Sequence, residues 1–220
     1  MEKVVVIRKS DDYGSEKIHH VLKLGGFAVS RRQIQKILDF KGLTDSCEKR
    51  RGQRKYVRFC WRLSNYMWHC DWSEYKNKWY CAFIDDCSRK ILAVAEFDNA
   101  TTENALFILY QAILTHKVSP VVVLSDKGSQ FYANKYDKKG KKGMGKFEEE
   151  MKVLGIDFWT SRRNHPQTNG KMERWFSTLK TRKKKHPEEN LQDFIKWYNE
   201  KRIHHALQYK TPEEVYWSKV

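Results

Sequence analysis

The stretch MWHCDWSEYKNKWYCAFIDDCSRKILAVAEF, residues 67–97, decides the fold. It contains three runs rich in aromatic and β-branched residues, Met67–Glu74, Lys78–Asp85 and Lys90–Phe97, which is the composition of β-strands. The residues between these runs are sufficient only for short turns. Because short connections join antiparallel neighbours, the stretch predicts an antiparallel three-stranded meander.

The residues that follow predict helices and two further strands. Thr101-Thr102 supplies an N-cap for an amphipathic helix that runs to about His116. The apolar run Val121–Leu124 then predicts a buried strand, parallel to the first strand of the meander. Further along, Phe147–Leu154 predicts a helix and Ile156–Thr160 a short strand.

Three acidic residues are candidates for a functional site. Asp71 lies within the first predicted strand, Asp126 follows a buried strand at its carboxyl end, and Glu173 lies in a predicted helix. Ionised carboxylates are costly to bury unless they are paired or bind metal, and three together would repel one another. A divalent cation with a preference for oxygen ligands, Mg²⁺ or Mn²⁺, would resolve this conflict. The alternative is three unrelated surface acids.

The composition indicates a polyanionic partner. The chain has 220 residues, a hydrophobic fraction of 40% and a formal net charge of +16, which allows one medium-sized domain with a small appendage. Nucleic acid is favoured over a membrane, because no amphipathic basic anchor stands out. No apolar run approaches about 18 residues and no signal-peptide pattern is present, so we expect a soluble protein in the prokaryotic cytoplasm, associated with the nucleoid.

Five cysteines are scattered along the chain without a paired C-x-x-C motif. This pattern gives no disulfide framework and fits a reducing compartment. A zinc site built from His69, Cys70, Cys81 and Cys87 is an alternative. A small buried thiol is the commoner role for cysteines that alternate along strands.

The N-terminal residues predict two helices separated by Gly25-Gly26. Ser30 is a good N-cap for the second helix, Arg31–Phe40, which carries Arg31, Arg32 and Lys36. Helix, glycine turn and basic helix resemble a helix-turn-helix DNA reader, and the alternative is a helical hairpin with a solvated basic face.

Composition also suggests a division of the chain. Residues 1–45 form a helical, DNA-binding-like segment, and the strongly basic residues 46–64 form a linker that can follow phosphates. Residues 65–216 form the core, with a basic insertion loop at residues 127–146 that is rich in lysine and glycine.

Three motifs carry a resemblance to a known family. Trp68-His69-Cys70-Asp71, residues 80–89 (YCAFIDDCSR) and residues 124–131 (LSDKGSQF) resemble the integrase core shared by insertion-sequence transposases and retroviral integrases. The resemblance implies an α/β, ribonuclease-H-like fold, in which helices flank a mixed five-stranded sheet.

Residues 165–174 (HPQTNGKMER) are the most specific stretch and resemble the motif of the family's third acid, Glu173. The 46 residues between Asp126 and Glu173 exceed the family's usual spacing, which makes the Lys/Gly-rich tract an insertion. Asn169, Lys171 and Lys180 lie near Glu173 on the predicted helix and are candidates for DNA contacts.

The resemblance implies a DNA transposase or integrase that uses two Mg²⁺ or Mn²⁺ ions. Asp71 would bridge both metals, Asp126 would bind one and Glu173 the other. Cleavage would free a DNA 3′-hydroxyl at the end of a mobile element, and this hydroxyl would attack target DNA. Joining two DNA ends suggests a homo-oligomer, at least a dimer on DNA. No serine or tyrosine nucleophile is needed.

Three other readings remain open from the sequence. The chain could be another ribonuclease-H-like nuclease, an inactive transposase remnant that binds DNA, or a zinc-dependent binding module. Persistent DNA binding in EDTA without strand transfer would favour the remnant, and bound zinc would favour the zinc module.

Overall fold

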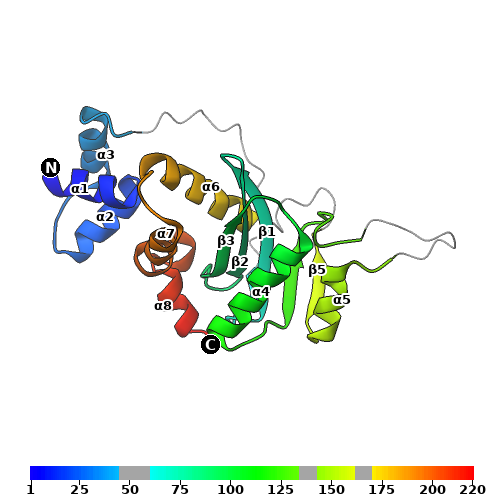
Figure 1. Ribbon diagram of the computed structural model, residues 1–220. Coiled ribbons are helices and arrows are strands. Elements are labelled where there is room, and N and C mark those ends of the chain that lie inside the picture. Colours follow the sequence, from blue (N-terminus) through cyan, green and yellow to red (C-terminus); the bar gives the residue numbers. More distant parts are fainter. Residues whose placement is uncertain (45–59, 134–142, 162–169) are drawn as a thin grey trace. The chain divides into compact units, whose positions relative to one another are not determined.

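Two units make up the chain, and each is described by itself. The computed structural model describes residues 1–44, 60–133, 143–161 and 170–220 (Figure 1). Contacts between residues divide the chain into a smaller unit, Met1–Val57 with Arg202–Thr211, and a larger unit, Arg58–Lys201 with Pro212–Val220. The described residues include no helix that is both long and apolar enough to cross a bilayer.

The larger unit contains a mixed five-stranded sheet with the strand order β3-β2-β1-β4-β5. β1, β2 and β3 pair antiparallel, whereas β4 pairs parallel with β1 and with β5. The expected meander and the expected parallel strand are therefore confirmed. The strands are β1 (Met67–Tyr75), β2 (Lys78–Asp85), β3 (Ile91–Phe97), β4 (Val122–Ser125) and β5 (Asp157–Thr160).

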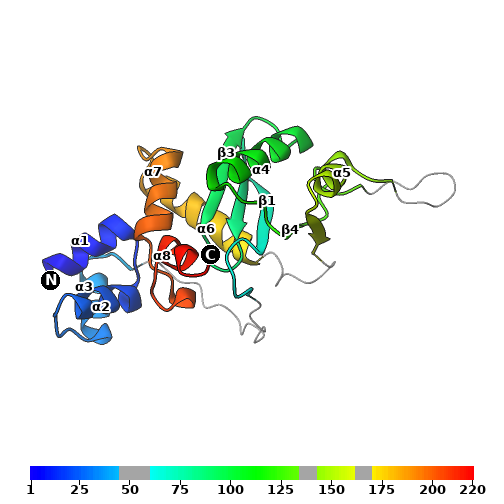
Figure 2. The ribbon, with the colours of Figure 1, turned by 90° about the horizontal axis from the view of Figure 1, so that it is seen from below.

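Helices cover both faces of this sheet (Figures 1 and 2). On one face, α4 (Thr102–His116) packs against Trp68, Cys70, Phe83 and Val123. On the other face, α6 (Gly170–Lys185) packs through Met172, Trp175, Phe176 and Leu179 against Ala82 and Ile84. The remaining helical elements are α5 (Lys146–Val153), α7 (Leu191–Lys196), the π-helical turn η1 (Trp197–Lys201) and α8 (Pro212–Trp217).

The smaller unit contains three helices, α1 (Glu2–Asp11), α2 (Ser15–Leu24) and α3 (Arg31–Phe40). Ile18 and Leu22 of α2 pack against Ile34 and Leu38 of α3, and the first apolar run of the chain belongs to α1. Ser30 caps α3, because its side chain accepts from Gln33 N while the Gln33 side chain accepts from Ser30 N. The two expected helices are present.

By their contacts, residues 202–211 group with the N-terminal helices in the smaller unit. Ile203 packs on the helices and donates its backbone N–H to Tyr13 Oη at 2.9 Å. Tyr209 stacks on His20 with ring centroids 4.2 Å apart and donates a hydrogen bond to Glu16. Through these contacts the segment packs with the N-terminal helices, although it follows η1 in sequence. It contains a short 3₁₀ turn, η2 (His205–Leu207).

Several predictions from the sequence lie outside the described residues. Most of the basic linker, residues 45–59, falls there, as do residues 134–142 of the insertion. Residues 162–169, which include Asn169 and the first half of the third-acid motif, fall there too.

Replacing Asn199 with alanine is expected to lower the free energy of unfolding by about 1–3 kcal/mol. The buried Asn199 side chain accepts from Ile91 N and donates to Ile91 O, both at 2.9 Å. Its loss removes these partners of the backbone N–H and C=O of Ile91, in the edge strand β3. Urea denaturation measures the change. Glu200→Ala, at the exposed neighbouring position, is the control and should change stability by less than about 0.5 kcal/mol.

Candidate active site

Asp71 lies on β1, and Asp126 directly follows the neighbouring parallel strand β4. The β1–β4 register pairs His69 with Leu124, so each acid lies two residues beyond this pair on its own chain. Residues two apart on a strand point to the same face. Asp71 is paired with Ala82, which lies on the face of the sheet that α6 covers. Met67, Val122 and Leu124 form one cluster, so Asp126, two residues after Leu124, follows the same face at its end. The structure thus brings these two predicted residues together.

Each aspartate accepts a hydrogen bond from a nearby backbone amide. Trp72 N donates to Asp71 Oδ1 at 2.8 Å, and Gly128 N donates to Asp126 Oδ1 at 2.9 Å. A Cβ atom at position 128 would lie 2.9 Å from Asp126 Oδ1 and 2.8 Å from Gln130 Oε1. Glycine therefore allows the loop after β4 to close tightly around the carboxylate.

Both carboxylates raise the pKa of the same buried thiol, that of Cys70. Burial raises the pKa of the Cys70 thiol well above its ordinary value, and the charges of Cys81, Asp71 and Asp126 raise it further. Burial and then Asp71 likewise raise the pKa of Cys81. The two cysteines are therefore neutral core residues at neutral pH.

Glu173 lies on α6 beside the buried arc of that helix, and its side chain is exposed. Lys180 follows two turns later on the same side and is half-buried. No group of three His, Cys, Asp or Glu residues that could hold a metal ion occurs within the described ranges. The oxygen ligands of Asp71 and Asp126 suit a hard divalent cation, but Glu173 does not complete a three-acid cluster with them. The alternative zinc set of His69 and three cysteines does not form a cluster either.

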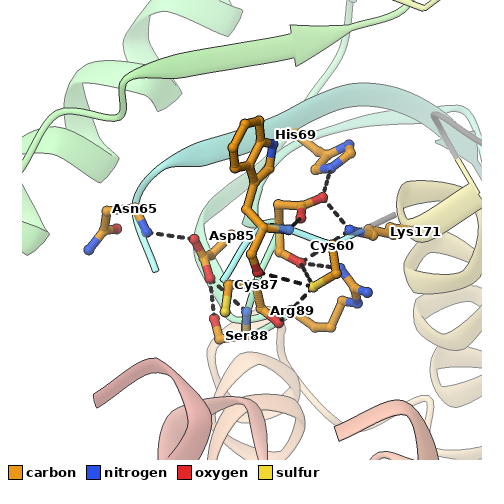
Figure 3. Close-up of polar contacts among 10 residues, drawn as sticks. Cys60, Asn65, His69, Asp85, Cys87, Ser88, Arg89 and Lys171 are labelled. Carbon is orange, nitrogen blue, oxygen red and sulfur yellow. Dashed lines mark hydrogen bonds and ion pairs between the residues drawn. The ribbon is translucent and has the colours of Figure 1, made fainter. Parts of the chain in front are cut away.

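A buried acid that the sequence analysis did not single out, Asp86, has its polar partners on several sides, and Figure 3 labels two of them, His69 and Lys171. Its Oδ1 accepts from His69 Nε2 at 2.5 Å and forms an ion pair with Lys171 Nζ, and its Oδ2 accepts from Trp61 N at 2.7 Å. The Asp86 side chain is 1% exposed. The signal in the sequence was the pair of acids, Asp85-Asp86, at the end of an apolar strand.

Asp85 has a different set of partners. Its carboxylate accepts from Asn65 N at 2.8 Å, from Ser88 N at 2.7 Å and from Ser88 Oγ at 2.6 Å (Figure 3). Burial raises the pKa of Asp85, and the hydrogen bonds from Ser88 and Asn65 oppose this rise. Asp85 thus fixes the turn after β2, and Asp86 is left to face β1 and α6.

The charges in the network follow from burial and pairing. Burial alone would raise the pKa of Asp86, but His69 and then Lys171 outweigh it, so the pKa of Asp86 lies below its usual range. Burial lowers the pKa of His69 despite its hydrogen bond to Asp86. At neutral pH the His69 ring is therefore neutral and donates Nε2–H, and Lys171 supplies the charge that faces the carboxylate.

The residues predicted to contact DNA have different environments. The Lys171 side chain is 15% exposed and paired with Asp86, so its role at a phosphate stays a prediction. Arg31, Arg32 and Lys36 are exposed along α3, and Arg31 lies 3.9 Å from Glu16. Lys180 is half-buried near Glu173 on α6.

Comparison with known families identifies the larger unit. Residues 62–166 match a family model described as an integrase core domain, and residues 154–212 match a second model with the same description. The two models together cover residues 62–212, so the chain belongs to the integrase core family.

Two bacterial proteins are similar in sequence. The chain is 25% identical over 230 aligned positions to the transposase for insertion sequence element IS904 of Lactococcus lactis, covering 92% of this chain and 86% of that protein. It is 28% identical over 169 residues to y4bF of Sinorhizobium fredii, which is named as a transposase. That match covers 73% of this chain and 36% of y4bF, so the chain spans about a third of the length of this relative.

Solved structures share the fold. The catalytic core domain of BIV integrase superposes with a TM-score of 0.54 at 21% identity, over 70% of this chain and 95% of that one. The HTLV-2 integrase catalytic core domain in complex with magnesium gives 0.52 at 20% identity, over 70% and 97%. The expected ribonuclease-H-like fold class is confirmed.

His69→Gln, which keeps an N–H donor, tests the charge state of the buried ring. In the wild type, unfolding stability should fall as the pH drops below about 6.5, because the unfolded histidine binds a proton that the buried ring rejects. In the variant, the slope of the unfolding free energy against pH should be smaller by up to about 1.4 kcal/mol per pH unit. Urea denaturation at several pH values measures it. An unchanged slope would contradict a neutral His69.

Proposed function

We propose that this protein is a DNA transposase or integrase that frees a DNA 3′-end and joins it to target DNA. The observation that carries the proposal is the pair Asp71 and Asp126, aligned on neighbouring strands of an integrase core beneath the helix that bears Glu173. The catalytic residues in this proposal are these three acids.

The donor set suits divalent cations that prefer oxygen ligands. Asp71 and Asp126 would hold Mg²⁺ or Mn²⁺, and Glu173 would complete the site from α6. Two such ions, when bound, activate a hydroxyl nucleophile and stabilise the leaving oxygen of a phosphodiester. A similar fold, that of HTLV-2 integrase, has been solved in complex with magnesium, which supports this choice of metal.

The chain's own side chains bind and orient the DNA. A net charge of +16 favours the DNA backbone over a neutral ligand. Lys180 lies on the same side of α6 as Glu173 and would hold a phosphate near the acids, while Arg31, Arg32 and Lys36 would contact DNA from α3. Joining two DNA ends would require at least a dimer on DNA.

A second candidate function is DNA binding by an inactive remnant of a transposase. The exposed position of Glu173, outside any three-acid cluster of the described residues, favours it. Such a protein would bind DNA equally well in EDTA and in Mn²⁺ and would transfer no strand. The active enzyme would respond to the metal.

Asp126→Asn tests the proposed site. Strand transfer, measured with oligonucleotides that carry the flanking repeats of the element in Mg²⁺ or Mn²⁺, should fall by at least about 100-fold, because the amide is a poor ligand in place of a charged carboxylate. Asp157→Asn, at an exposed acid on the adjacent strand β5, is the control and should retain wild-type activity. Equal activity of Asp126→Asn and wild type would refute the site.

Lys180→Gln tests the DNA contact on α6. Removing one phosphate contact should lower the slope of log affinity against log salt concentration by about 1, for any DNA sequence. Fluorescence anisotropy with labelled duplex DNA, at several salt concentrations, measures the slope. Lys152→Gln, at an exposed lysine of α5, is the control, and an identical slope in both variants would exclude Lys180 as a phosphate contact.

A further inference from the structure

We infer that Lys171 is a positioning residue, whose ion pair with Asp86 sets the rotation of α6 on the sheet and so the place of Glu173. This inference rests on the proposed function, in which Glu173 is a catalytic acid. It differs from the expectation that Lys171 holds a DNA phosphate.

The anchor on the sheet side is rigid. Asp86 is held through its backbone N–H, which donates to Met67 O at 2.9 Å, and through the hydrogen bonds from Trp61 N and His69 Nε2. The backbone oxygen of Asp86 also accepts from Arg89 Nη1. Because these contacts hold the Asp86 carboxylate in place, we expect the ion pair to fix the position of Lys171 and of the first turn of α6.

The helix side of the contact lies in the first turn of α6. Lys171 is the second residue of the helix, and its Nζ contacts both Asp86 Oδ1 and Asp86 O, the latter at 3.2 Å. Glu173 follows two residues later in the same turn. A displacement of this turn would move Glu173 with it.

Geometry explains why one ion pair can set the rotation. Successive helical residues are about 100° apart, so Lys171 and Glu173 flank the buried Met172 on opposite sides of the packed arc. Apolar packing through Met172, Phe176 and Leu179 is non-directional and leaves the helix some freedom to roll. The ion pair fixes one flank of the helix, and the opposite flank, with Glu173 and Lys180, is fixed as a consequence.

Three variants separate positioning from simple charge compensation. Lys171→Met removes the cation but leaves a buried carboxylate uncompensated, which destabilises the fold. The double variant Asp86→Asn with Lys171→Met removes both charges and is the folded test protein, and Asp86→Asn alone completes a double-mutant cycle. Lys184→Met, at an exposed lysine in the last turn of α6, is the control.

The first measurement is hydrogen exchange of the full chain. In the double variant, the amides of the first two turns of α6 should exchange at least about tenfold faster than in wild type, while those of β1 and β2 stay protected. Wild-type protection of α6 in the double variant would show that Lys171 only neutralises Asp86, and would overturn the inference. This readout needs neither metal nor activity.

The second measurement links the helix to the site. Misplacement of Glu173 should lower the strand-transfer rate of the double variant by roughly 10- to 100-fold and raise the Mn²⁺ concentration needed for half of the maximal thermal stabilisation. DNA affinity and its salt dependence should match wild type. A salt slope lower by about 1 would instead make Lys171 a phosphate contact and overturn the inference.

The two measurements keep the proposals distinct. A wild-type protein without strand transfer or any thermal response to Mn²⁺ would refute the proposed function, while hydrogen exchange would still decide the role of Lys171. Additive effects of Asp86→Asn and Lys171→Met on α6 exchange would mean that Lys171 does not act through Asp86, and would also overturn it.

Discussion

Parallel pairing of β1 with β4 is the constraint on which the rest of the larger unit depends, because it places Asp71 beside Asp126. Unit charges at the spacing of neighbouring strands, about 5 Å, repel by about 3 kcal/mol at an effective dielectric constant of 20. The backbone amides of Trp72 and Gly128 each donate a hydrogen bond to one of these carboxylates and so offset part of this repulsion. In the proposed function, a divalent cation would relieve this repulsion.

The core of the larger unit has three layers, with the sheet between α4 and α6. α4 buries the face of the sheet that carries Cys70, and α6 buries the face that carries His69 and the two site aspartates. Dispersion and hydrophobic burial hold these layers together without direction. Direction comes from the polar network around the buried, ionised Asp86, which accepts a hydrogen bond from the neutral His69 and is compensated by the charge of Lys171.

The sequence by itself determined the five strands, the antiparallel pairing of the meander and the parallel pairing of β4 with β1. Short turns dictate antiparallel neighbours, the apolar run before Asp126 dictates a buried parallel strand, and Ser30 with Gln33 defines where α3 begins. These features depend on residues that are near in the chain, so local propensity and periodicity are sufficient to predict them. The motifs around Asp71, Asp126 and Glu173 likewise identified the integrase core before any coordinates.

Only the tertiary structure decided which distant groups meet. It paired Lys171 with Asp86, 85 residues away in sequence, and thereby gave an internal partner to a side chain that the sequence had assigned to DNA. It packed residues 202–211 with the N-terminal helices and left Glu173 on the exposed flank of α6. The physical reason is that burial and charge compensation depend on the whole surroundings of a group, whereas sequence patterns report only one face of one element.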